Sequence, residues 1–539
     1  MKTFSTKEEV DVCIVGGALG GLMARVLAEG GLSVVILDAG PRWNPARDFV
    51  NDPWEMEKKM DRNMPFLYAG DAKGPGEMTV FAVGGRMNHW GASTPRYRPE
   101  VFLSKTKQGF GEDWPLTYED LLPYYQKAER EFGVAGDHTQ YPFARDPFPL
   151  PAHALNYGDQ VLKKGFEAAG LRTFQGAHAI LSQPYQGRPA CNYCGFCHYG
   201  CPVNSKANPL ITHIPQAIAA GAELRTQSYV KEITADQAGR ANGVVYVDAD
   251  RTEQRQKARM VILASGPPLS RLLLLSKSKQ FPQGLANRNG QVGKNVFSNG
   301  APVTVWGIYE QRLEAYRGFA SLSSYDFIGS DEKRGFVGGF AVGTQTAGFR
   351  RPEQLIQYAS PGWGRDLKGF MKDFYAHCVG VSSGNSSVGL VNEKNFVDLH
   401  PEARDEWGMP LARVAMYRMD NERAMRKFTI KIMTDIHAAA GAKKVFLEGE
   451  GGGPAPRDRR EEDDPPPSYL GGDCRMGKDP KTSVVNSFSQ SHDVKNLFLL
   501  GVSTMVGGAH GPVTLTLAAL TYRAGEYILR NKRNIFAAA

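Results

Sequence analysis

The chain has 539 residues, of which 42% are hydrophobic and 22% are charged, and this usage excludes a disordered, fibrous or coiled-coil protein. At about 150 residues per domain, the length indicates two to four structural units. Lys and Arg number 64 against 56 Asp and Glu, which gives a net charge of +8. No Lys/Arg tract accompanies this mild excess, so composition does not favour a nucleic-acid partner.

No segment approaches the roughly 20 apolar residues that a membrane helix needs. The first ten residues are polar and charged, unlike a secretory signal. We therefore expect a soluble chain without a direct membrane span and without an export signal of its own.

The N-terminus has the pattern of a β–α–β unit. Val10–Val15 predicts a buried strand, Leu22–Glu29 a helix and Ser33–Leu37 a second strand closed by Asp38. The intervening turn contains five small residues, namely Gly16, Gly17, Ala18, Gly20 and Gly21. Small residues there let a pyrophosphate approach the helix N-terminus, and an acid such as Asp38 holds a ribose hydroxyl. The fit to G-x-G-x-x-G is imperfect, because Ala18 replaces the middle glycine.

Further elements follow in chain order. We expect a helix over Leu116–Phe132, with Thr117 as its N-cap. Residues 449–467 contain a run of glycines, then a run of charged residues and then three prolines, so we expect a surface loop there. The other expected elements are strands over Val230–Thr234, Gly243–Val247, Met260–Ala264 and Asn496–Leu500 and helices over Pro268–Leu275, Asn421–Ala440 and Thr514–Leu529.

Four of the seven cysteines, Cys191, Cys194, Cys197 and Cys201, lie within one short stretch. Their spacing is that of the bacterial ferredoxin run, so an iron–sulfur cluster is the first interpretation. A tetrathiolate zinc site, paired disulfides in an exported protein and free thiols are the alternatives.

Several segments spread over nearly the whole chain together resemble the glucose–methanol–choline (GMC) family of FAD-dependent oxidoreductases. The similarity is nearest to the bacterial gluconate, fructose, glucose and glucoside 3-dehydrogenase catalytic subunits, and pyranose oxidase is a more distant relative. The segments are Val12–Gly21 with Asp38, Val83–Ser93, Ala264–Gly266, Val292–Asn295, Cys474–Pro480 with Asn486, and Asn496–Leu500 through Leu520.

The resemblance implies an α/β protein, with a Rossmann-like FAD-binding domain and a discontinuous α+β substrate domain. The expected FAD-binding domain comprises 1–100, 190–300 and 465–539, and the substrate domain 101–189 and 301–448. Besides the turn glycines, Ala18 and Asp38, the expected flavin contacts are Gly84, Gly85, Asn88, His89, Trp90, Gly91, Ala264 and Thr514. In pyranose oxidase the residue matching His89 is bonded covalently to the flavin. For this chain we expect His89 to lie near the flavin and make no prediction about a covalent bond. The alternative is that His89 only stabilises the glycine-rich turn.

The family oxidises an alcohol by passing its hydroxyl proton to a base and a hydride to flavin. The chain departs from the family at both usual base positions, which Tyr469 and Pro512 occupy. His510 lies in the adjacent glycine-rich loop, so we expect His510 as the base and Tyr469 as its hydrogen-bonding partner. The alternative makes His510 a turn residue and Tyr469 a packing residue, and Asn299 and Asp473 are weaker candidates.

The expected reaction is oxidation of a secondary or anomeric hydroxyl of a sugar, glycoside or polyol to a ketone or lactone. Cys191, Cys197 and Cys201 match a cluster loop of the glucose and fructose dehydrogenase subunits, which favours an external electron acceptor. A small subunit and a haem acceptor subunit are the expected partners, and no nucleic acid is. The compartment is cytoplasmic by default, or periplasmic after export with a partner. An oxygen-using pyranose-type oxidase and a non-catalytic electron-transfer flavoprotein are the alternatives.

Overall fold

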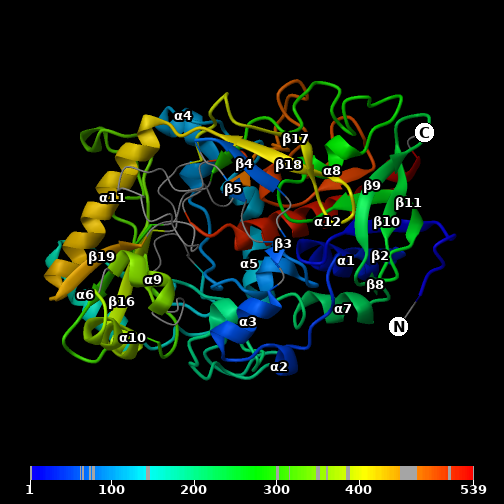
Figure 1. The fold of residues 1–539 in the computed structure, drawn as a ribbon. Helices are drawn as coiled ribbons and strands as arrows, with labels where there is room; N and C mark the ends of the chain where they lie inside the picture. Colours follow the sequence, from blue (N-terminus) through cyan, green and yellow to red (C-terminus); the bar gives the residue numbers. More distant parts are fainter. Residues whose placement is uncertain are drawn as a thin grey trace.

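The largest sheet of the structure, a computed structural model, holds seven strands among the described residues and lies on the right of Figure 1. Its order is β8-β2-β1-β11-β10-β9, and β21 pairs with β11 as a branch. The strands are β1 Val10–Val15, β2 Val34–Leu37, β8 Glu223–Arg225, β9 Tyr229–Ala235, β10 Ala241–Val247, β11 Glu253–Leu263 and β21 Leu497–Leu499. The described residues are 3–60, 62–63, 66–71, 74–75, 79–140, 146–298, 303–314, 316–346, 352–359, 362–383, 389–448, 470–507 and 511–537.

The middle of this sheet is parallel. β1 lies between β2 and the second half of β11, while the first half of β11 pairs antiparallel with β10. Helix α1 (Leu19–Glu29) connects β1 to β2, so the predicted β–α–β unit is present. The carboxyl ends of β1, β2 and β11 therefore meet at one edge of the sheet, where ligands of such folds bind.

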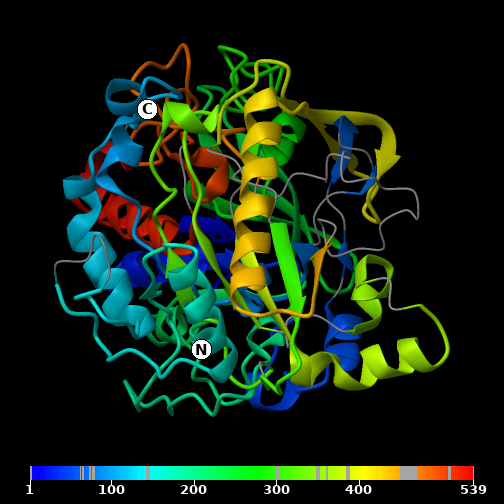
Figure 2. The same cartoon turned by 90° about the vertical axis from the view of Figure 1, so that its left-hand side faces the viewer.

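A second, antiparallel sheet of six strands in the described part lies on the left of Figure 1, and Figure 2 shows α11 (Asp420–Ala439) across it. Successive side chains along its strands point to opposite faces of the sheet, and both faces are packed against helices. Val303 and Val305 belong to the cluster that includes Met433 of α11, whereas Trp306 packs with Phe374 of α10. The strands are β7 Phe174–Gln175, β13 Val303–Ile308, β14 Leu322–Ser324, β15 Val342–Gln345, β16 Cys378–Ser383 and β19 Lys444–Glu448.

A smaller sheet joins distant parts of the chain. The hairpin of β17 (Phe396–Arg404) and β18 (Pro410–Met416) pairs through β18 with β4 (Phe66–Gly70), in parallel, and β4 pairs with β5 (Gly74–Pro75). Two-stranded ladders complete the described sheets, namely β3 (Arg62–Asn63) with β6 (Thr79–Val80) and β12 (Phe297–Ser298) with β20 (Leu470–Gly471).

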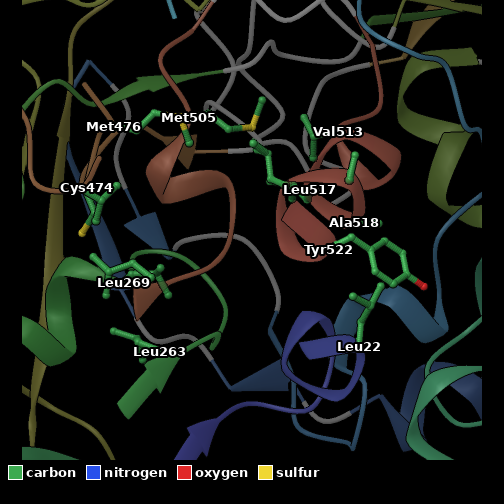
Figure 3. Close-up of a cluster of buried hydrophobic side chains, with 14 of the residues drawn as sticks. Leu22, Leu263, Leu269, Cys474, Met476, Met505, Val513, Leu517, Ala518 and Tyr522 are labelled. Atoms are coloured by element: carbon green, nitrogen blue, oxygen red, sulfur yellow. The ribbon is translucent and has the colours of Figure 1, made fainter. Parts of the chain in front are cut away.

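The last long helix, α12, closes the core over the large sheet. Figure 3 shows Leu517 and Tyr522 of α12 in the same buried cluster as Leu22 of α1. Thr117 caps α5 in a complete capping box, and Pro123 does not delay that helix. The helices not yet given are α2 Pro45–Asp48, α3 Pro53–Lys59, α4 Ser104–Gln108, α5 Tyr118–Phe132, α6 Tyr157–Ala168, α7 His213–Ala219, α8 Ser270–Leu275, α9 Pro352–Ala359, α10 Arg365–His377 and α12 Thr514–Ala537.

Among the described helices, none is both long enough and apolar enough to cross a lipid bilayer.

Helix α7 packs on α1 and holds the turn before it. The His213 Nε2 atom lies 2.9 Å from the carbonyl oxygen of Ala18, so this nitrogen carries the proton and donates it. Because the ring is buried, the pKa of His213 falls to about 4, although the bond to Ala18 opposes this shift. His213 is therefore neutral at pH 7 and ties α7 to the N-terminus of α1.

We expect a His213→Gln variant to lose part of the acid sensitivity of the protein. Between pH 6.5 and 4 the unfolded chain binds a proton at this residue that the folded chain excludes. The free energy of unfolding therefore falls with decreasing pH, by up to about 1.4 kcal/mol per unit for one such group. Urea titrations at pH 6.5, 5 and 4 should show a shallower decrease in the variant. An unchanged slope, equal to that of a His138→Gln control, would contradict this role.

Candidate functional site

The turn between β1 and α1 is built from glycines that have no room for a side chain. Gly16 has φ +96°, and a Cβ atom there would lie 2.7 Å from the carbonyl oxygen of Ala264, at the end of β11. A Cβ on Gly21 would lie 2.4 Å from Ile214 of α7, and one on Gly20 would lie 2.7 Å from β1. The glycines thus bring the N-terminus of α1, with its unpaired N–H groups, to the sheet edge, as a pyrophosphate site requires.

Asp38 follows β2 and faces this turn. Its carboxylate accepts hydrogen bonds from Gly17 N at 2.8 Å and from Gly40 N at 3.0 Å. Burial raises the pKa of Asp38 to about 6, while the bonds from Gly40 and Gly17 oppose the rise. Asp38 therefore fixes the turn itself, and each oxygen keeps a second lone pair that can accept a bond from a ribose hydroxyl.

The segment from Gly84 to Gly91, which we call the flavin loop, lies beside the turn. Gly84 and Gly85 have positive φ angles of 92° and 51°, and the short helix η1 (Gly85–Asn88) follows. Asn88 is fully buried and donates from Nδ2 to the carbonyl of Val83 at 2.9 Å. Within the described residues its Oδ1 has no hydrogen-bond partner, so this acceptor is available to a bound group.

His89 occupies an aromatic cage in the same loop. Its ring centroid lies 5.7 Å from that of Trp43 and 5.9 Å from that of Phe49, both in edge-on contacts. Burial lowers the pKa of His89 to about 3, and the nearby charge of Lys206 adds to the shift. His89 is therefore a neutral ring at pH 7. Trp90 donates from Nε1 to the carbonyl of Ala207 at 2.7 Å.

Two further predicted contacts lie at the ends of elements. Ala264 donates its N–H to Val15 and presents its carbonyl to Gly16, so it forms one wall of the turn. Thr514 is the first residue of α12, the helix that packs on α1. The turn, Asp38, the flavin loop and Ala264 fit a flavin dinucleotide: they offer a glycine cradle, helix N–H groups and one unpaired buried acceptor.

The two expected catalytic residues, Tyr469 and His510, lie outside the described residues, as does Asn299. The segments next to them are described and lie side by side, because Cys474 N and Met476 N each donate at 2.9 Å to the carbonyls of residues 503 and 504. Residues 472–476 thus run parallel to residues 502–504.

Asp473, the weaker candidate, is buried and has a different task. Its Oδ2 accepts the N–H of Ser270 at 2.9 Å at the start of α8, and its carbonyl accepts from Gly293 N. Burial raises the pKa of Asp473. The carboxyl group therefore holds α8 in place.

The cysteine loop, residues 191–201, was predicted to hold a metal centre, and no finding supports that prediction. The described residues contain no group of three or more His, Cys, Asp or Glu side chains placed to hold a metal ion. The sulfurs are instead used locally, since Cys191 Sγ accepts from Tyr193 N at 3.3 Å and Cys201 Sγ from Lys206 N at 3.4 Å. The prediction of Cys191, Cys194, Cys197 and Cys201 as metal ligands is therefore not supported, for iron–sulfur or for zinc.

The disulfide alternative is wrong, because all seven cysteines are free. Burial raises the pKa of Cys191 to about 11 and that of Cys197 to about 12. Both are therefore thiols at pH 7.

Two residues that hold the site, His213 and Lys206, were not identified from the sequence. Lys206 is fully buried and contacts the flavin loop, and His213 contacts the turn. Neither residue belongs to a motif with a recognisable spacing. Both bind backbone carbonyls, which every residue has, so the sequence does not reveal their partners.

Comparison with known proteins places these features in a family. Two family models described as GMC oxidoreductase match residues 108–299 and 391–521. The chain is 32% identical to a 2-methyl-1,2-propanediol dehydrogenase of Mycolicibacterium austroafricanum, over 98% of this chain and 97% of that protein. It is 27% identical to the fructose dehydrogenase large subunit of Gluconobacter japonicus, over 97% of this chain and 98% of that subunit.

The fold is similar to that of a formate oxidase of Aspergillus oryzae, with a TM-score of 0.67 at 14% identity, covering 99% of this chain and 100% of that one. The expected α/β fold with a Rossmann-like FAD-binding part is thereby confirmed. The matches span both ends of the chain, and the residues of the site fit a flavin dinucleotide. The chain therefore belongs to the GMC oxidoreductase family and is an FAD-dependent oxidoreductase.

Proposed function

We propose that this enzyme oxidises a secondary or anomeric hydroxyl group of a sugar, glycoside or polyol to a ketone or lactone and passes the electrons to an external acceptor. The observation that carries the proposal is the near full-length similarity to relatives named as dehydrogenases of a diol and of a sugar. The sugar relative supports the secondary or anomeric position, whereas the diol has only a primary and a tertiary hydroxyl and supports alcohol oxidation in general. The large-subunit name of the second supports a small subunit and a haem acceptor subunit as partners.

The flavin site of this proposal consists of Gly16, Gly17, Ala18, Gly20, Gly21, Asp38, Gly84, Gly85, Asn88, His89, Trp90, Gly91, Ala264 and Thr514. When bound there, FAD supplies a hydride acceptor. The N-terminus of α1 stabilises the pyrophosphate charge, and Asp38 accepts a hydrogen bond from the ribose.

We assign the proton chemistry to His510 and Tyr469, which both lie outside the described residues. His510 takes the hydroxyl proton of the substrate on a ring nitrogen, and Tyr469 hydrogen-bonds to the same oxygen. Their positions support this assignment, because Tyr469 stands where the family usually has a His and His510 lies two residues before the second usual base position.

The division of the chain into an FAD-binding part (1–100, 190–300 and 465–539) and a substrate part (101–189 and 301–448) belongs to the same proposal. The first part supplies all seven strands of the parallel-centred sheet, and the second supplies all six of the antiparallel sheet. The pairing of β4 with β18 crosses between them, so the two parts share a sheet.

The reaction is tested by anaerobic bleaching of the flavin. We expect the absorbance near 450 nm, an approximate value for oxidised flavins, to fall on addition of at least one member of a panel of sugars, glycosides and polyols, including 1,2-diols. Reoxidation by an artificial acceptor faster than by air would support the external acceptor, whereas stoichiometric hydrogen peroxide would indicate an oxidase. A flavin that no alcohol bleaches would contradict the proposed reaction.

The catalytic pair is tested by substitution. We expect His510→Ala to lower kcat by about 10² to 10⁴-fold, the range for loss of a general base. Tyr469→Phe should lower it by about tenfold, the equivalent of one hydrogen bond. Both variants should keep their flavin, and His138→Ala should keep full activity. Unchanged turnover in His510→Ala would exclude this residue as the base.

The role of Asp38 is tested by FAD binding. Asp38→Asn puts an NH₂ group opposite one of the two backbone N–H donors of Gly17 and Gly40. Because the carboxylate is also the proposed acceptor of the ribose hydroxyl, we expect a loss of about 1–3 kcal/mol in FAD binding, or about 5- to 150-fold in affinity. Fluorescence quenching of FAD added to apoprotein measures this loss. The control is Asp137→Asn, a surface carboxyl group bonded to Thr139; equal affinities in the two variants would refute the role of Asp38.

A further inference from the structure

Lys206 is a fully buried lysine in the segment that follows the cysteine loop. Its Nζ donates to the carbonyl oxygens of Asn88 at 2.9 Å, Trp90 at 2.9 Å and Cys197 at 2.5 Å. An ammonium group has three N–H donors, so every one is used. Two of the acceptors belong to the flavin loop and the third to the cysteine loop, more than 100 residues away in sequence.

The flavin loop touches residues 198–207 at two further points. Trp90 Nε1 donates to the carbonyl of Ala207 at 2.7 Å. Gly91 lies so close to His198 that a Cβ atom on this glycine would be 2.9 Å from the imidazole Cε1. The contact is therefore a packed interface in which Lys206 is the buried charge.

A buried ammonium is stable only while all its hydrogen bonds are made, because water cannot replace them. The three carbonyls are consequently held in one direction. The carbonyls of Asn88 and Trp90 lie on either side of His89, so Lys206 sets the peptide planes that flank this residue.

We propose that Lys206 is a positioning residue for the cofactor. It fixes the flavin loop on the cysteine loop, so that Asn88 and His89 keep their places beside the flavin. This inference rests on the proposed flavin site at Gly84–Gly91. It also gives the cysteine loop a purpose that needs no metal: it is the rigid support to which the flavin loop is fastened.

The test replaces Lys206 by Met, which has a side chain of similar length without donors or charge. The matched control is Lys277→Met, at an exposed lysine after α8. In Lys206→Met we expect FAD affinity, measured by fluorescence quenching on apoprotein, to fall about tenfold or more. The rise in Tm that FAD gives to the apoprotein should shrink. The visible flavin spectrum should change, and the midpoint potential should become more negative because a nearby positive charge is lost.

If Lys206→Met binds FAD within twofold of Lys277→Met and has the same spectrum and potential, the proposal is overturned. Should Lys206→Met not fold, Lys206→Gln decides, since its neutral amide has only two N–H donors for the three carbonyls. A several-fold weaker affinity with an altered spectrum supports the proposal, and an unchanged protein overturns it.

Asn88→Ala separates this inference from the proposed site. If Asn88→Ala weakens FAD binding but Lys206→Met does not, Lys206 has no positioning role and the flavin site stands. If neither variant affects FAD binding, the assignment of the flavin loop fails, and the inference fails with it.

Discussion

The close approach of Gly16 to the carbonyl of Ala264 is the constraint on which the site depends. β1 and β11 are neighbours in the parallel ladder, so the turn after β1 must pass beside the end of β11. A side chain at Gly16 would push the turn away from the sheet edge, and α1 would no longer start there. Asp38 then holds the turn from the other side through Gly17. The same few backbone atoms thus form the turn from β1 to α1, pack against the end of β11 and face the cofactor site.

The same constraint explains the imperfect dinucleotide motif. An added Cβ would collide with side chains at Gly17, Gly20 and Gly21, whereas at Gly16 it would meet the backbone of Ala264, which cannot move aside. Ala18 is the N-cap of α1, and its carbonyl is held by His213 rather than by a side-chain cap of its own. A methyl group is tolerated at this position because Ala18 has a φ of −70° and is only half-buried.

Local patterns predicted the local structure well. The β1–α1–β2 unit, the capping of α5 by Thr117 and the long helix α11 follow from periodicity and end signals over short windows. The pairing of β7 with β14, and of β4 with β18, could not be predicted, because strands of two to seven residues hundreds of positions apart leave no common signal. In the site, the glycines and Asp38 had a motif, whereas Lys206 and His213 bind backbone carbonyls and had none.

The cysteine run shows the limit of spacing as evidence. Spacing states which thiols are able to meet, and these four lie near enough to act electrostatically on one another, but nearness alone does not make a metal site. Here Tyr193 N–H and Lys206 N–H are directed at two of the sulfurs, and the Lys206 ammonium binds the loop backbone at Cys197. The loop is therefore ordered by hydrogen bonds that involve the flavin loop as well. A residue that satisfies three carbonyls at once lets two irregular segments be rigid without a sheet or a helix between them, and rigidity is what a cofactor needs from the residues beside it.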